Sequence, residues 1–439
     1  MQKSPKLSLI MFFCREHFNP FRMRYVAVLF FGFVLLSVFP TRSLCCTSVI
    51  ITGKITPDGR PMMWKNTDAL VFDQRLSFVK GEKYDWIGLA LEDNPVNAWF
   101  GTNSAGFCIM NTMSYNFIDN EAWDINNGFI MKLALDKCAS LEEFLHLLDT
   151  IAKPIPVSSN YGVIDTLGNA VYVETFPTGY HVVDVNDPAI APEGFLVYTN
   201  YSRYGKMDGG MGYIRYYAAE QILRDAIAAG EPLTPHFIFE KMARSFYHPL
   251  LGSDLRKMVD EGYDPPSGFF PDCDFIPRRI SVVTSVIQAV CPGENPELTT
   301  LWTALGYPPC SIAVPAWVSC GKEGLPVVIR QLEGNEKHDS PMCIKASALK
   351  LEVFPITRGN GKNYFRFSTL YNSRGTGIIQ RLAPIEAHIR DITLPLLEKW
   401  RSEGRISDIE RNSLCREIDA FLMENFINKD FVVNNEVVF

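Results

Sequence analysis

The stretch CTSVIITGKITPDGRPMMWKNTD, residues 46–68, decides how this chain is expected to fold. Its first part, Thr47 to Lys54, is rich in β-branched residues, which favour a strand. Pro57-Asp58-Gly59-Arg60 has the chemistry of a tight turn, because proline presets φ and glycine tolerates a positive φ. Pro61 to Lys65 then predicts a return strand, so the stretch is expected to form a β-hairpin.

The hairpin returns three polar residues, Lys65, Asn66 and Asp68, to the start of its first strand, next to Cys46. If the chain is cut before Cys46, that residue carries both a thiol and a free α-amine. Their ordinary pKa values, about 8.5 and about 7.7–8.0, are close enough for the amine to accept the thiol proton. The pair is therefore a nucleophile with its own base and needs no histidine.

The first part of the chain has the pattern of an export signal. Basic residues up to Arg24 precede an apolar run from Tyr25 to Phe39. This run is shorter than the roughly 20 residues that span a bilayer, and it suits the core of a signal peptide. Met23, directly before Arg24, is an alternative start of the same signal.

The end of the signal sets where the mature chain is expected to begin. Ser43 and Cys45 are small residues at the third and first positions before a cut in front of Cys46. We therefore predict that residues 1–45 are removed and that the protein is exported, to the periplasm or the extracellular medium, without stable insertion in a membrane. A retained anchor or a lipid-modified cysteine is the alternative, although Arg42 and Ser43 fit a lipid-attachment motif badly.

Charge and cysteine spacing exclude several classes of function. The residues from Cys46 on contain 36 basic and 48 acidic side chains and no basic run, so a nucleic-acid partner is not expected. They contain nine cysteines without a CxxC pair, so we expect no metal and no cofactor. Eight of these cysteines could pair in an oxidising compartment, but their low density favours buried free thiols.

Several strands, a helix group, further strands and further helices follow one another after the hairpin, which indicates an α+β fold in layers. We expect one domain, residues 46–439, with a helical extension from about residue 384. The expected helices are 128–138, 141–151, 214–229, 235–246, 384–400 and 407–426, with a strand at 279–290 and a long surface loop at 247–271.

Three blocks of the hairpin together carry a family resemblance: Cys46-Thr47-Ser48, the turn at 56–61, and Trp64-Lys65-Asn66-Thr67-Asp68. They resemble the opening of the choloylglycine hydrolase and acyl-CoA:6-aminopenicillanic acid acyltransferase-like group of N-terminal-nucleophile (Ntn) hydrolases. The resemblance extends from Cys46 to about Ala316. It implies a four-layer αββα sandwich, two antiparallel sheets between helical layers, and an enzyme that acts on the C–N bond of linear amides.

The resemblance also implies roles for single residues. Cys46 would be the nucleophile and its amine the base. The basic-x-x-Asp pair of the family falls on Lys65 and Asp68, with Asp68 holding the amine through a charge-assisted hydrogen bond. The family has an arginine where this chain has Lys65, so a fork of donors becomes a point charge.

Three further positions match the family in short motifs. Asn111 follows a glycine-containing turn between strands, and Asn200, in a Thr-Asn pair, matches an asparagine that donates to the oxyanion. Arg279 matches an arginine beside the nucleophile, where a guanidinium would favour the thiolate. Arg278 competes with Arg279, because alternation along a strand turns only one of the two inward.

The expected partner is a small amide substrate with an apolar acyl part. An acyl transferase, which passes the acyl group from Cys46 to an amine instead of water, would use the same residues. An Ntn dipeptidase is an alternative enzyme, and a non-catalytic exported binding protein on an Ntn scaffold is an alternative of another class.

Overall fold

The structure, a computed structural model, describes residues 46–90, 97–117, 127–155, 157–263, 265, 267–331 and 339–431. The predicted signal, residues 1–45, lies outside them. The chain from Leu44 onward clusters as one unit, and the description concerns this unit alone. Among the described residues, no helix has the length and apolar character needed to cross a membrane.

The hairpin predicted from residues 46–68 is confirmed. Strand β1 (Thr47–Ile51) pairs antiparallel with β2 (Met62–Asp68), with Thr47 opposite Asn66. The turn between them is tight: a Cβ atom on Gly53 would lie 2.0 Å from the carbonyl oxygen of Gly59. All twelve residues of the two strands are buried, because the sheet is covered on both faces.

The hairpin lies at the centre of a six-stranded sheet with the order β10-β1-β2-β14-β15-β16, in which every pair is antiparallel. Its other strands are β10 (Phe195–Tyr198), β14 (Ser281–Gln288), β15 (Thr300–Leu305) and β16 (Val314–Ala316).

A second, seven-stranded antiparallel sheet follows the order of the chain from β3 to β9. Its strands are β3 (Leu76–Val79), β4 (Trp86–Leu89), β5 (Phe100–Asn103), β6 (Cys108–Met113), β7 (Ser159–Ile164), β8 (Ala170–Phe176) and β9 (Gly179–Asp184). The inner faces of the two sheets touch where Tyr172 stacks on Tyr198 at 4.0 Å between ring centroids. The Ser48 hydroxyl lies 3.1 Å from the Tyr172 hydroxyl, which joins the same two sheets.

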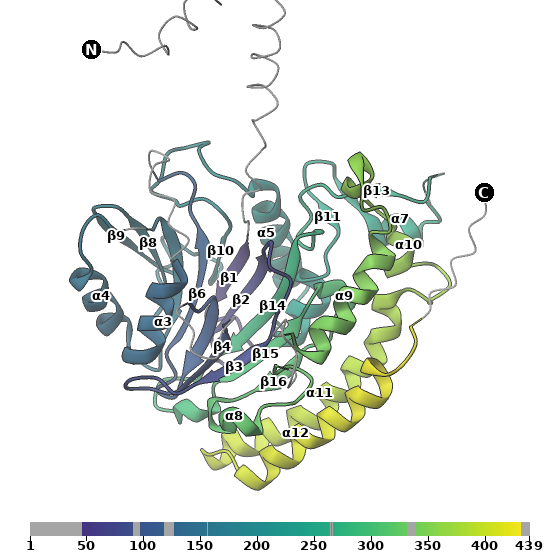
Figure 1. Ribbon diagram of the computed structural model, residues 1–439. Coiled ribbons are helices and arrows are strands. Elements are labelled where there is room, and N and C mark those ends of the chain that lie inside the picture. Colours follow the sequence, from purple (N-terminus) through teal and green to yellow (C-terminus); the bar gives the residue numbers. More distant parts are fainter. Residues whose placement is uncertain are drawn as a thin grey trace, which may run out of the picture. The chain divides into compact units, whose positions relative to one another are not determined.

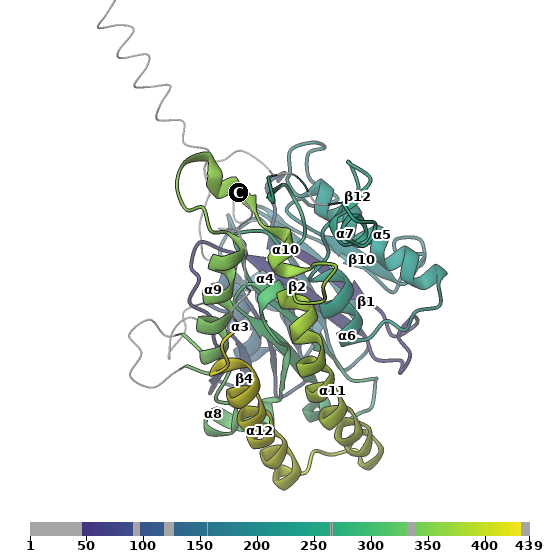
Figure 2. The ribbon, with the colours of Figure 1, turned by 90° about the vertical axis from the view of Figure 1, so that its right-hand side faces the viewer.

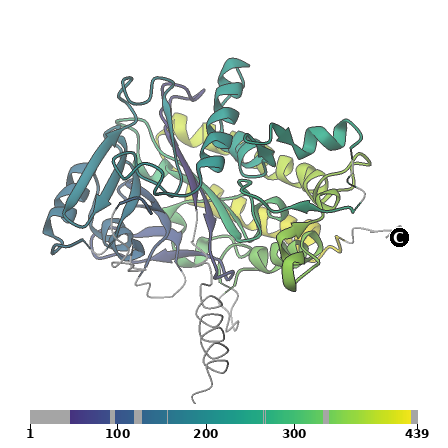
Figure 3. The same cartoon turned by 90° about the horizontal axis from the view of Figure 1, so that it is seen from above.

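Helices cover both outer faces (Figure 1). Helices α3 (Asn127–Lys137) and α4 (Leu141–Thr150) pack on the seven-stranded sheet through a separate apolar cluster that includes Leu135 and Phe144. On the other side lie α9 (Pro341–Val353), α11 (Ile378–Glu403) and α12 (Asp408–Leu422), as Figure 2 shows. Figure 3 shows the blue and the yellow-green parts on opposite sides of β1 and β2. The predicted αββα sandwich is confirmed.

The remaining helices and strands are short or lie at the edges of the layers. The helices are α5 (Tyr213–Ala228), α6 (Pro235–Phe237), α7 (Leu255–Asp260), α8 (Gly321–Gly324) and α10 (Phe367–Leu370), and the 3-10 or π turns are η1 (Ile238–Met242), η2 (Pro296–Leu298), η3 (Pro308–Cys310), η4 (Val318–Cys320), η5 (Gly359–Asn363) and η6 (Met423–Ile427). The short strands are β11 (Tyr247–His248), β12 (Ser253–Asp254), β13 (Phe270–Pro271) and β17 (Tyr364–Phe365).

Three expectations about these elements are corrected. The region 247–271 is not a plain loop, since it contains α7 and three short strands. Helix α11 begins at Ile378 rather than near residue 384, because the Gln380 side chain accepts from the Gly377 amide and caps the first turn. Where one helix was expected at 235–246, the structure has the short helix α6 followed by the π turn η1, which ends at Met242.

Candidate active site

Cys46 lies at the start of β1, beside the end of β2, and is 8% exposed. Burial raises the pKa of its thiol, and the nearby backbone amide of Asp68 lowers it. In the full-length chain the nitrogen of Cys46 is a peptide amide, so an amine exists there only after a cut in front of Cys46. The hairpin therefore brings the predicted nucleophile and Asp68 together, as the sequence predicted.

Lys65, on β2 opposite Ser48, is buried between the two sheets. Its Nζ donates to the Trp99 carbonyl oxygen at 2.9 Å and to Oδ1 of Asn111 at 2.8 Å. Burial lowers the pKa of Lys65, and the nearby Cys46 raises it. The same charge acts in return on the thiol: burial raises the pKa of Cys46, and Lys65 lowers it.

Asp68 is held by an arginine and a serine. Arg278 donates to Oδ2 through Nε at 3.1 Å and Nη2 at 2.5 Å, and the Ser281 hydroxyl donates to Oδ1 at 2.6 Å. The carboxylate is buried. The ion pair therefore fixes the end of β2, whose Asp68 backbone amide lies near the Cys46 sulfur. The predicted bond between Asp68 and the amine of Cys46 stays a prediction.

The choice of Arg279 over Arg278 was wrong as to which arginine faces Asp68. The Arg279 guanidinium turns the other way, to the carbonyl oxygens of Ile356 and Lys362 at 3.2 and 3.0 Å. The reason is local: both arginines precede β14, which begins only at Ser281. The alternation of a strand therefore does not apply to them.

The two predicted asparagines occupy different places in the site. Asn111, on β6, accepts from Lys65 and donates through Nδ2 to the Ser159 hydroxyl at 3.3 Å. Asn200, just after β10, is buried and donates through Nδ2 to the Met113 carbonyl oxygen at 3.0 Å. Asn111 therefore lies beside Lys65. The oxyanion role of Asn200 stays a prediction.

Arg215, on α5, is a residue of this site that sequence reasoning missed. It is completely buried. Its Nη1 donates at 2.7 Å to the carbonyl oxygen of Cys46 and at 2.7 Å to the Thr47 hydroxyl, and its Nη2 donates to Oδ1 of Asn200 at 3.1 Å. One guanidinium thus connects the predicted nucleophile with the predicted oxyanion donor.

The only sequence signal for Arg215 was a glycine. Gly212, at φ +85°, directly precedes α5, and a Cβ atom there would lie 2.4 Å from Nη2 of Arg215. An arginine within a predicted helix otherwise looks like a surface residue, because most arginines are exposed. Because Gly212 has no side chain, the guanidinium of Arg215 can pass it and reach the site.

Among the described residues, no group of three or more histidine, cysteine or acidic side chains is placed to hold a metal ion. The nine cysteines from Cys46 on are free thiols in the structure. What the site offers is a thiol, a buried ammonium, a carboxylate–guanidinium pair and two oriented amides.

Residues 55–209 match the family model of acyl-coenzyme A:6-aminopenicillanic acid acyl-transferase. This match confirms the predicted resemblance to the acyltransferase-like group and agrees with the predicted enzyme class, action on the C–N bond of a linear amide. A comparison with curated proteins gives no match.

Solved structures resemble the chain at low identity. A mutant of the conjugated bile acid hydrolase from Clostridium perfringens is 13% identical, with 64% of this chain and 94% of that chain covered and a TM-score of 0.40. The N-acylethanolamine-hydrolyzing acid amidase ortholog of Caenorhabditis elegans is 16% identical, with 55% and 92% covered and a TM-score of 0.35. Penicillin V acylase from Agrobacterium tumefaciens is 13% identical, with 62% and 86% covered and a TM-score of 0.35.

Proposed function

We propose that this protein is an exported N-terminal-cysteine enzyme that cleaves a linear, non-peptide amide through an acyl-enzyme on Cys46. Removal of residues 1–45 creates the α-amine that the reaction needs. The substrate has an apolar acyl part, and no cofactor takes part. The acyl group passes to water or, in a transferase, to an amine.

The observation that supports this proposal is the position of the Cys46 sulfur. It is buried near the Lys65 side chain and the Asp68 backbone amide, both of which lower the thiol pKa that burial raises. Its residue is fixed from the other side, since Arg215 binds the Cys46 carbonyl oxygen. Without such contacts the first residue of a chain would fray.

The chemistry follows from these groups. The α-amine of Cys46 takes the thiol proton, and the thiolate attacks the amide carbonyl carbon. The C–N bond then breaks, the ammonium returns its proton to the departing amine, and the acyl group stays on sulfur as a thioester. Water, deprotonated by the amine, attacks the thioester and releases the acid. Lys65 stabilises the thiolate by its charge.

Asn200 is the proposed donor to the oxyanion of the tetrahedral intermediate. Arginine can only donate, so the bond from Arg215 identifies the facing atom of Asn200 as Oδ1 and turns Nδ2 away from the arginine. A donor aimed at the developing oxyanion contributes about 3 kcal/mol to catalysis. Removing it should cost about a hundredfold in kcat.

Intact mass spectrometry during turnover of a panel of acyl amides tests the proposal. We expect an acylated intermediate on Cys46, no turnover with Cys46→Ala, and at most weak turnover with Cys46→Ser. Cys291→Ala is the matched control, because that half-buried thiol lies beside the turn of the hairpin, where it donates to the Gly59 carbonyl oxygen at 3.4 Å. Undiminished turnover by a folded Cys46→Ala protein would overturn the proposal.

Two rival functions give different results in the same experiment. A dipeptidase would cleave dipeptides in preference to acyl amides, with the same loss in Cys46→Ala. A binding protein on an Ntn scaffold would cleave neither, and alkylating Cys46 would change no activity.

A further inference from the structure

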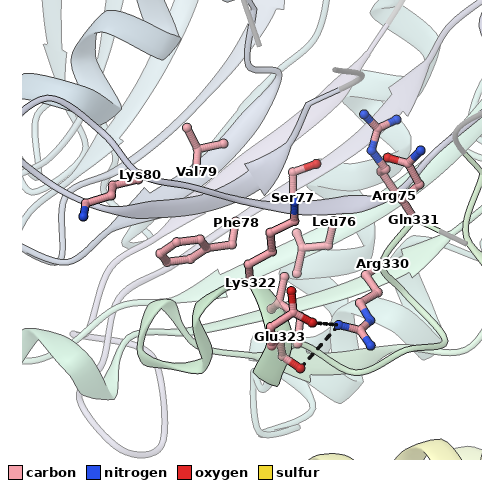
Figure 4. Close-up of a pocket in the computed structure, with 11 residues that line it drawn as sticks. Arg75, Leu76, Ser77, Phe78, Val79, Lys80, Lys322, Glu323, Arg330 and Gln331 are labelled. Carbon is pink, nitrogen blue, oxygen red and sulfur yellow. Dashed lines mark hydrogen bonds and ion pairs between the residues drawn. The ribbon is translucent and has the colours of Figure 1, made fainter. Parts of the chain in front are cut away.

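A groove of about 540 Å³ runs along strand β3, the edge strand of the seven-stranded sheet. Residues 75–80 form one wall, and residues around α8 and Arg330 form the other. None of its lining residues belongs to the candidate active site. Figure 4 shows Arg75 and Lys80 toward opposite ends of the strand, with Lys322 between them.

The edge of β3 presents main-chain groups to this groove. The Leu76 amide donates away from β4, to the Ile329 carbonyl oxygen at 2.8 Å. In an antiparallel pair, residues whose N–H and C=O point away from the neighbouring strand recur at every second position. The N–H and C=O of Phe78 therefore also point away from β4, into the groove. A segment laid beside Phe78 could continue the sheet.

The groove is basic in an otherwise acidic chain. Lys80, Lys322 and Arg330 line it together with the buried Arg75, whereas Glu323 is the acidic residue among its described lining residues. Arg330 binds this glutamate, with Nη1 3.3 Å from Oε2. Lys80 and Lys322 are exposed, and the formal charge of the whole chain is −7. An acidic partner is the one that this local charge favours.

We propose that this groove binds an extended, acidic segment of another protein, which adds to β3 as a further strand. Main-chain hydrogen bonds at Phe78 would supply register and affinity, as in other cases of strand addition, and the lysines would select acidic side chains. The half-buried ring of Phe78 would receive apolar side chains at alternate positions of the segment. This activity is separate from the proposed chemistry at Cys46.

Other occupants fit the groove less well. A second copy of this chain would set its own Lys80 and Lys322 against these lysines, and like charges at an edge oppose pairing. A nucleic acid would contact the basic side chains. It has no peptide backbone, so it could not pair with the N–H and C=O of Phe78 as a strand does. The test includes both outcomes.

Fluorescence anisotropy with labelled eight-residue peptides measures the binding. We expect a peptide of alternating glutamate and valine to bind, and an alternating lysine–valine peptide not to bind. An alternating glutamate–proline peptide has the same charge but lacks half the amide donors, so it should bind at least about tenfold more weakly. Hydrogen exchange should slow in residues 75–80 when the glutamate–valine peptide is added.

Charge reversal locates the site. The pair Lys80→Glu and Lys322→Glu should weaken binding about tenfold or more. Lys257→Glu, on the exposed face of α7 outside the groove, should leave it unchanged. Equal binding of the two acidic peptides, or binding without slowed exchange at 75–80, would overturn the proposal. So would tighter binding of a single-stranded oligonucleotide, or peptide-independent dimers lost in the double variant. Every readout is independent of amide cleavage.

Discussion

Arg278 binds Asp68 through two nitrogens, Nε at 3.1 Å and Nη2 at 2.5 Å from Oδ2. The side chain of Asp68 is fully buried, and that of Arg278 is 14% exposed. A paired charge of this kind cannot lose its partner without leaving a buried charge unbalanced. Because the backbone amide of Asp68 lies near the Cys46 sulfur and lowers the thiol pKa that burial raises, the ion pair fixes part of the environment of the predicted nucleophile.

Arg278→Ala should therefore damage both the fold and the activity. We expect a loss of about 3–5 kcal/mol in the free energy of unfolding, and a fall of at least about a hundredfold in kcat/KM for amide cleavage. Arg279→Ala is the control on the neighbouring residue and should leave kcat/KM within about threefold. Thermal unfolding and steady-state kinetics measure the two effects. Equal loss of activity in both variants would contradict the assignment of Arg278.

Arg215→Met should lower kcat without a matching rise in KM. The variant removes the donors to the Cys46 carbonyl oxygen and to Oδ1 of Asn200, so only the bond from Nδ2 to the Met113 carbonyl oxygen still orients the Asn200 amide. Arg244→Met is a matched control, because Arg244 is also buried and also donates to two carbonyl oxygens, those of Pro308 and Ser311.

Both arginine variants should be less stable, but only Arg215→Met should also slow catalysis, by about tenfold to a hundredfold. Combining it with Asn200→Ala should add little further loss, because both changes act on the same proposed oxyanion donor, Nδ2 of Asn200. Kinetic constants and unfolding midpoints of five proteins provide the measurement: the original, Arg215→Met, Asn200→Ala, their double variant and Arg244→Met. Fully additive losses would show that Arg215 does not act through Asn200.

Lys65→Met should raise the thiol pKa of Cys46. Burial already raises that pKa, and the positive charge of Lys65 lowers it. The fraction of thiolate at pH 7 should fall about tenfold for each pH unit by which the pKa rises, so alkylation of Cys46 should be slower and its pH profile should move upward. Lys350→Met, at another buried lysine, should leave the profile in place. An unchanged profile in Lys65→Met would refute the electrostatic role.

Asp272→Asn should stabilise the protein above pH 6. Burial raises the pKa of Asp272 from 3.8 to about 6, so the folded state binds this proton more tightly than the unfolded state. Stability from this group is thus present below pH 3.8 and is lost as the pH rises to about 6. Asparagine keeps the acceptor for the Arg279 amide, which bonds at 3.0 Å.

The unfolding midpoint of Asp272→Asn should exceed that of the original protein by about 2 °C at pH 8. The two midpoints should converge at pH 4, where the carboxyl group of the folded protein is protonated. A gap of the same size at both pH values would attribute the effect to packing instead of ionisation.

The hairpin could be predicted from the sequence, because turn chemistry and strand propensity depend on a few neighbouring residues. Cys46, Lys65 and Asp68 came together for that reason: Thr47 pairs with Asn66 and Ser48 with Lys65, which places Cys46 beside the end of β2. The orientation of Arg278 and Arg279 could not be predicted, since it depends on where β14 starts. Arg215 was missed because its partners lie on β1 and after β10, and only the packing of α5 brings them together.

Helix boundaries show the same division. The start of α4 was predicted correctly at residue 141, where the Ser140 hydroxyl accepts from the Glu143 amide at 3.2 Å and caps the helix. Helix α11 begins earlier than predicted, because its cap is Gln380 acting on Gly377 and on the distant Asn372. A serine cap three residues before a glutamate can be recognised in a sequence. The contact between Gln380 and Asn372 cannot, because it depends on how the chain before α11 is folded.

The central claim is that Cys46 becomes the first residue of the working protein. The most direct test is the mass of the N-terminal peptide of protein recovered from the exported fraction. The account predicts a chain that begins at Cys46 with an unmodified amine. A chain that begins upstream, or that carries lipid on Cys45, would leave Cys46 without its own base and would contradict the mechanism.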